Sequence, residues 1–222
     1  MQLFGQVGPN GPAADGTTLP IRQGKYAEVS VSELQGRFYE LCYRGMLFSN
    51  GMTVTALSAN TITLTATTTP ILGVYNPSGS PVNLVILQAG LTWFPNTFTT
   101  PAAPGAFVWA SSINNPAITT GTPPYNHKTM VSSGSQAKGM AFQALTGLTN
   151  NLVIFAGSDI ESPGTVAYGT QPGTAVVPLG QGNQNFDGSL IVPPGGVLAL
   201  LNTVSTTAFS VAGRLMWAEV AV

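Results

Sequence analysis

The stretch from residue 45 to residue 127 contains no lysine, arginine, aspartate or glutamate. Charged residues make up 7% of the whole chain, far below the roughly 25% of typical soluble domains. Disorder does not explain this, because 44% of the residues are hydrophobic and disordered chains lack apolar side chains. A membrane helix does not explain it, because no run of about 18 consecutive apolar residues occurs. We therefore expect a folded protein whose surface consists of uncharged polar residues.

Period-two alternation within this stretch predicts β-strands. The segment "NTITLTATTT", residues 60–69, places Ile62, Leu64 and Ala66 on one face and threonines on the other. Threonine favours β-structure, and it keeps the solvent side of a strand polar without adding charge.

The most hydrophobic part of the chain is expected to be a pair of strands, 71–75 and 82–91, joined by the turn "NPSGSP". In that turn we expect Asn76 to accept local hydrogen bonds, Pro77 to fix its own φ, and Gly79 to adopt a positive φ. The second strand contains four consecutive apolar residues, so we expect both of its faces to be covered. Its second face would meet the N-terminal arm or a neighbouring subunit.

Short strands bounded by proline and glycine recur through the rest of the chain. They are expected at 106–112, 139–145, 151–156, 174–177, 189–192, 197–201 and 208–220. Inward-facing residues of the last strand would be Phe209, Val211, Leu215 and Trp217. The polar segment 114–136 is expected to be an exposed loop. This spacing predicts an all-β fold, an antiparallel β-sandwich of jelly-roll type, for residues 46–222.

Residues 1–45 differ from the rest in their charge, and we expect them to form an extended N-terminal arm. Charged residues crowd together here: Arg22, Lys25, Glu28, Glu33, Arg37, Glu40 and Arg44. Residues 27–31 alternate like a strand, whereas 32–43 fit a short helix and a strand about equally well.

No catalytic or cofactor-binding motif occurs in the chain, so we expect neither enzymatic activity nor a cofactor. His127 lies in a loop with no nucleophile motif nearby, and we expect a surface histidine. Asp159, Glu161 and Asp187 are the carboxylates that would have to meet in a calcium site, although solvation in loops and turn capping explain them more simply. Cys42 is the only cysteine, and we expect it to be a small buried hydrophobic residue. Trp93, Trp109 and Trp217 are expected to be core or interface anchors.

The small net charge of the chain limits the kinds of partner that it can bind. A formal net charge of -1 disfavours nucleic acid and an anionic membrane surface, both of which require basic faces. No secretory signal is visible at the N-terminus, which favours synthesis in the cytoplasm. An uncharged polar surface avoids the desolvation cost of burying ions at an interface, and near-zero net charge promotes association. We therefore expect a permanent assembly subunit.

Four segments, taken in order, resemble a group of tailed-bacteriophage virion proteins: "RQGKYAEVSVSELQGRFYELCYRGMLFSNG", "ILGVYNPSGSPVNLVILQAGL", "IVPPGGVLALL" and "RLMWAEVAV". The resemblance implies a jelly-roll subunit, often a homotrimer, that decorates or cements a capsid. Its partner would be the major capsid protein and its location the capsid surface of the virion. Related architectures occur in head fibres and tail parts. A receptor-binding module for host glycans, using the loop around Tyr125 and the tryptophans, is therefore the alternative, and a polysaccharide depolymerase is a weaker one.

A decoration protein of this kind would hold the capsid through its charged N-terminal segment. The residues expected at that interface are Arg22, Lys25, Arg37, Tyr39 and Arg44.

Overall fold

The computed structural model describes residues 5–6, 21–22, 36–56, 70–95, 107–115, 117–118, 121–140, 152–157, 180–202 and 209–222. The chain divides into two compact units, Met1–Tyr39 and Glu40–Val222. In the first unit, strands β1 (Gly5–Gln6) and β2 (Ile21–Arg22) pair in parallel. The strands expected at 27–31, 60–69 and 174–177 lie outside the described residues.

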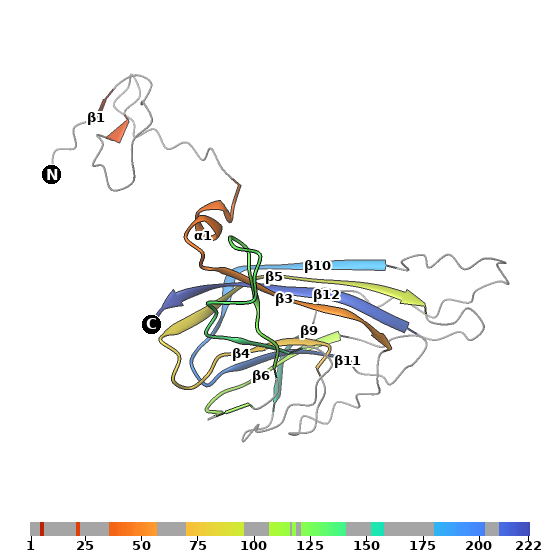
Figure 1. Cartoon of the computed structure of the whole chain (residues 1–222). Coiled ribbons are helices and arrows are strands. Elements are labelled where there is room, and N and C mark those ends of the chain that lie inside the picture. Colours follow the sequence, from red (N-terminus) through yellow and green to blue (C-terminus); the bar gives the residue numbers. More distant parts are fainter. Residues whose placement is uncertain are drawn as a thin grey trace. The chain divides into compact units, whose positions relative to one another are not determined.

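Two five-stranded antiparallel sheets make up the second unit (Figure 1). Sheet I has the order β10 (Gly180–Val192), β5 (Val82–Pro95), β12 (Phe209–Ala221), β3 (Leu47–Ala56) and β7 (Tyr125–Asn126). Sheet II has the order β8 (Lys138–Met140), β4 (Leu72–Tyr75), β11 (Val197–Asn202), β6 (Phe107–Ser112) and β9 (Val153–Gly157). Among the described residues the one helix is α1 (Tyr39–Tyr43). The predicted all-β, antiparallel sandwich is confirmed.

A single hydrophobic core joins the inner faces of the two sheets. Val211, Leu215 and Trp217 of β12 are fully buried in it, as their alternation predicts. Trp109 of sheet II reaches across the core, where its indole N–H donates a 2.7 Å hydrogen bond to Gln184 Oε1 of sheet I. The predicted role of Trp109 and Trp217 as core anchors is therefore confirmed, whereas the side chain of Trp93 lies outside the described part.

A change of register interrupts the consecutive apolar residues of β5 at Leu87. Leu87 pairs with neither neighbouring strand, because the register of β5 shifts by one residue against β12 at this point. Such a β-bulge changes which side of the sheet the following residues face. As a result Leu84 and Ile86 before the bulge, and Ala89 and Leu91 after it, all belong to the core. Leu87 is buried although it belongs to neither hydrophobic cluster.

Strand β11 is buried on both faces, since all six of its residues are buried; the four residues of the neighbouring strand β4 are buried as well. Leu198 and Leu200 face the main core, while Val197, Ala199 and Leu201 belong to a second hydrophobic cluster. That cluster includes two residues from outside the strands, Ile118 and Leu152. Part of the protein's own chain thus covers the outer face of sheet II.

The described residues of the segment 114–136 do more than form an exposed loop. It contributes strand β7, and Thr122 forms a bridge to Gly139 of β8. Ile118 and Asn126 are buried, although many of the other side chains are exposed. Short-range sequence patterns do not reveal a two-residue strand, because its partner β3 is distant in the sequence.

Asn76 organises the turn "NPSGSP", but as a donor rather than an acceptor. Its Nδ2 donates to the carbonyl oxygens of Val82 at 2.8 Å and Val192 at 3.0 Å. Its backbone N–H donates to Gly196 O, and its own carbonyl accepts from the N–H of Gly195. The Asn76 side chain is fully buried, so these bonds form without competition from water.

A positive φ is found not at Gly79 but at Gly195, whose φ is 78°. The local turn closes through a bond from the Ser80 N–H to the Pro77 carbonyl, and this geometry does not require a positive φ at Gly79. Gly195 lies in the expected reversal "VPPGG", where the chain crosses from β10 of sheet I to β11 of sheet II. Its carbonyl accepts a hydrogen bond from the Asn115 N–H, which brings in the chain that follows β6.

The substitution Asn76→Asp tests this junction. It preserves shape but replaces the buried NH₂ donor with an acceptor. The buried Val192 carbonyl then loses its bond from Asn76, and the part-buried Val82 carbonyl keeps only the 3.3 Å bond from Ser80 Oγ. We expect the free energy of unfolding to fall by about 3 kcal/mol, measured by chemical denaturation. Asn183→Asp, at an exposed position, is the matched control and should change stability by no more than about 0.5 kcal/mol. Equal effects of the two substitutions would contradict the proposed role of Asn76.

Candidate interaction surfaces

Helix α1 ends in a Schellman motif that turns the chain into β3. The N–H of Met46 donates to the carbonyl of Leu41, and the N–H of Gly45 donates to that of Cys42. Gly45 has a φ of 72°, a conformation that glycine adopts without steric cost. The motif fixes the direction in which the last turn of α1 leaves the sandwich.

Asn126 attaches the turn after β7 to this helix end. Its Nδ2 donates to Gly45 O at 2.8 Å, and its Oδ1 accepts from the Lys128 N–H at 2.8 Å. Its backbone N–H and C=O bond to Val131 and Met130, which closes the turn. The turn 126–131 is therefore held next to α1.

Together these segments form a surface, which we call the α1–β7 surface. It comprises Tyr43, Arg44, Tyr125, Lys128, Met130 and Val131, all of them exposed. The Lys128 ammonium lies 5.1 Å from the centre of the Tyr43 ring, in a cation–π contact. Large exposed tyrosine and methionine side chains beside arginine are the composition that protein interfaces favour.

Electrostatic attraction on this surface is weak. Arg44 Nε lies 2.6 Å from Glu40 Oε1, with the two side chains 64% and 62% exposed. An exposed pair at this helical spacing contributes only about 0.3–0.5 kcal/mol. Arg44 and Glu40 can therefore leave this ion pair and bind a charged group of a partner protein at little cost in free energy.

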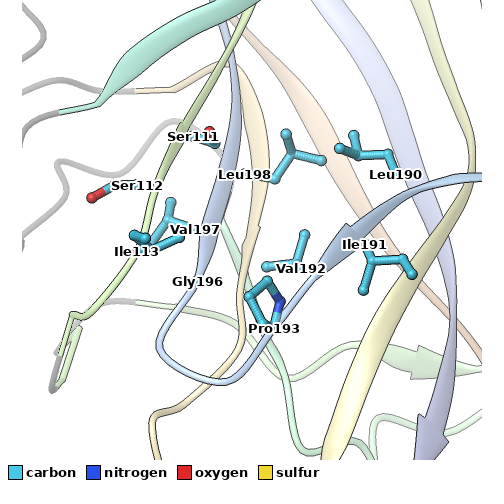
Figure 2. Close-up of a pocket in the computed structure, with 10 residues that line it drawn as sticks. All are labelled: Ser111, Ser112, Ile113, Leu190, Ile191, Val192, Pro193, Gly196, Val197 and Leu198. Carbon is cyan, nitrogen blue, oxygen red and sulfur yellow. The ribbon is translucent and has the colours of Figure 1, made fainter. Parts of the chain in front are cut away.

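A second surface is an apolar hollow of about 150 Å³ between the end of β6 and the reversal that joins β10 to β11 (Figure 2). We call it the β10–β11 hollow. Its lining includes Ile113, Ile191, Val192, Pro193 and Val197. Ile113 and Ile191 are more than half exposed, so apolar area stays in contact with water here.

The residues predicted to bind a capsid divide between the two units. Arg22 lies in β2, Arg37 and Tyr39 are exposed in the first unit, and Arg44 is in the second. The guanidinium of Arg37 lies 5.3 Å from the centre of the neighbouring Phe38 ring. Lys25 lies outside the described residues.

Sequence reasoning missed the contribution of the turn 126–131. Its sequence signal was the tripeptide Asn126-His127-Lys128 after a tyrosine, because asparagine commonly caps a turn through its side chain. The pairing of that turn with Gly45 had no local signal, since 81 positions separate the two residues.

In the described part of the chain no three histidine, cysteine, aspartate or glutamate side chains gather in a way that would hold a metal ion. Asp187 occupies a turn within β10 with a φ of 54°, while Asp159 and Glu161 lie outside the described residues. Cys42 is only half-buried in α1, with a free thiol. Among the described helices none is long and apolar enough to cross a membrane.

His127 is half-buried rather than a fully exposed surface histidine. Its Nε2 is buried and has no hydrogen-bond partner in the part of the chain that the structure describes. Burial, and to a lesser extent the positive charge of Arg214, lower the pKa of the His127 imidazole. The protonated form is therefore disfavoured in the folded protein.

No protein-family model, no curated protein and no solved structure matches the chain.

The lowered pKa of His127 predicts loss of stability in mild acid. Below its ordinary pKa of about 6.5, the unfolded chain binds a proton that the folded protein resists, so stability falls as the pH drops toward the lowered pKa. His127 is the only histidine, and histidine is the side chain whose ordinary pKa lies in this range. Denaturation curves between about pH 5 and pH 7 should show this decline for the natural chain but not for His127→Gln. The same decline in both proteins would contradict the assignment.

Proposed function

We propose that this chain is a structural subunit of a tailed-bacteriophage virion, a decoration or cement protein of the head that acts without catalysis. The observation that carries the proposal is the segregation of charge: residues 45–127 carry none, whereas the N-terminal segment is rich in it. The β-sandwich would form the permanent body, and the charged segment with the α1–β7 surface would hold the major capsid protein.

The strand order supports the jelly-roll assignment. Without the short strands β7 and β8, the sheet orders are β10-β5-β12-β3 and β4-β11-β6-β9. Two interleaved Greek keys, the definition of a jelly roll, place eight strands in two four-stranded sheets in this way. Strands β7 and β8 come from the connection between β6 and β9 and extend one edge of each sheet.

The surface chemistry supports a permanent assembly. Burying an ion at an interface costs desolvation that must be recovered by pairing, and the long uncharged stretch of this chain avoids that cost. The β10–β11 hollow would lie in the contact between copies, where the exposed Ile113 and Ile191 would be covered. A homotrimer around a symmetry axis fits this arrangement.

The α1–β7 surface supports the capsid contact. Tyr43 and Tyr125 offer large, stiff contact areas, and the exposed methionine Met130 adapts its shape to a partner. Arg44, in only a weak pair with Glu40, is available for a carboxylate of the shell.

The test is binding to phage heads that lack the protein. The double substitution Tyr43→Ser with Lys128→Glu removes an aromatic side chain and reverses a charge, and should weaken binding about tenfold or more. Co-sedimentation with the particles, followed by protein quantification, measures this. A version that begins at Glu40 should keep the sandwich and lose most of the binding.

Ile191→Thr is the control, because it alters the β10–β11 hollow and leaves the α1–β7 surface intact. It should reduce the mass of the free protein in light scattering while each folded copy still recognises the shell. Unchanged particle binding by the Tyr43–Lys128 variant would overturn the role of the α1–β7 surface. Absence of the natural chain from heads would overturn the decoration function, and presence only at the tail would favour the receptor-binding alternative.

A further inference from the structure

The outer face of sheet I carries a third feature, a shallow hollow of about 350 Å³ across β10, β5 and β12. Gly90 forms part of its floor. A Cβ atom at this position would come within 2.6 Å of Asn183 Oδ1, so the Asn183 side chain occupies the space that any larger residue would need. Thr92, Ala212 and Arg214 complete the rim.

A row of hydrogen-bonded polar side chains orients Arg214 beside the hollow. Arg214 Nη2 donates to Gln88 Oε1 at 2.6 Å, and Gln88 Nε2 donates to Asn185 Oδ1 at 2.9 Å. The row crosses three adjacent strands. Gln88 lies on β5, between β12, which carries Arg214, and β10, which carries Asn185. The register partners of Gln88 on these two strands are Met216 and Asn185. Exposed long side chains are normally mobile; this row restrains the guanidinium before any ligand arrives.

The charge of Arg214 lacks a counterion among the described residues. No described carboxylate forms an ion pair with it, and the guanidinium has five N–H donors, of which Gln88 engages one. The chain has only seven basic residues, and one of them, Arg214, lies on the central strand of sheet I with its side chain exposed. The planar group that complements it is a carboxylate, held through two parallel hydrogen bonds.

The other side of the hollow offers uncharged polar groups. Asn183 presents an exposed amide, and Thr92 presents a hydroxyl group from the adjacent strand. Leu91, which also lines the hollow, is buried, so the described residues of the lining include no exposed aromatic or large aliphatic anchor of the kind that dominates protein–protein contacts. Amide and hydroxyl groups match the hydroxyl groups of a sugar ring.

We propose that this hollow binds a carboxylate-bearing sugar, such as a uronic acid residue of a glycan. Arg214 holds the carboxylate, and Asn183 and Thr92 meet the ring hydroxyl groups. The proposal is independent of the decoration function, because it uses neither the α1–β7 surface nor the β10–β11 hollow.

The test is an NMR titration of the full-length protein with methyl glucuronide, and with methyl glucoside as the neutral probe. Methyl glucuronide should produce saturable shifts for residues of β5, β10 and β12 at millimolar concentrations, and methyl glucoside should bind about tenfold more weakly or worse. Arg214→Gln should cause a similar loss. Lys138→Gln, which removes an exposed basic side chain of sheet II, should bind like the natural chain.

A second variant, Gly90→Ala, leaves Arg214 in place and pushes the Asn183 side chain toward the hollow, so it should also weaken binding. The imidazole of His127 provides an internal readout. A carboxylate on Arg214 offsets the positive charge that contributes to the lowered pKa of His127, so that pKa should rise when methyl glucuronide is bound.

Three outcomes would overturn the proposal. One is the absence of saturable shifts with methyl glucuronide. Another is equal binding of the charged and neutral probes, or undiminished binding by Arg214→Gln. The third is a lower mass of Arg214→Gln in light scattering, which would mean that the guanidinium meets a carboxylate of another copy. None of these results bears on binding to phage heads, so this proposal and the proposed function fail separately.

Discussion

The Asn76 junction is the constraint on which the sandwich depends. Asn76 follows β4 of sheet II, yet the carbonyls it satisfies belong to Val82 and Val192 of sheet I. A buried carbonyl without a partner costs about 1–3 kcal/mol, so a single side chain stabilises the place where two connections cross between the sheets. The backbone bonds from Asn76 to Gly195 and Gly196 strengthen the second of these connections, between β10 and β11. The hydrogen bonds of the buried Asn76 thus hold together the connections between the two sheets.

Charge is scarce in this protein because hydrogen bonding and shape take over the roles that ion pairs play elsewhere. Trp109 and Gln184 bridge the sheets through a neutral bond, and Asn126 attaches a turn to α1 without an ionised group. Even the buried carboxylate of Glu219 is bound by neutral donors, the Ser135 hydroxyl and the Gln136 N–H. The surface of such a fold carries few charges. Copies can therefore associate without the free-energy cost of removing water from charged groups.

The sequence predicted what depends on neighbouring residues and missed what depends on distant ones. Period-two alternation identified β12 and its inward residues Val211, Leu215 and Trp217, because side-chain direction follows directly from strand geometry. It failed at Leu87, where a bulge shifts the register. It also misjudged Asn76, since Val192 lies 116 positions away. At the α1–β7 surface the charged Arg44 was expected, but the turn beside it depends on a contact that no local pattern encodes.

The three surfaces of the second unit differ in chemistry, and that difference separates their roles. The α1–β7 surface combines aromatic side chains with mobile charge, which suits a protein partner. The β10–β11 hollow is apolar and carries no charged group in its lining, which suits contact between identical copies. The outer face of sheet I has a guanidinium fixed by a neutral row, with small residues beneath. A carboxylate bound there gains the strength of a charge-assisted bond, while the oriented row reduces the entropy lost on binding. One β-sandwich with few charges therefore has room for assembly and for recognition on different faces.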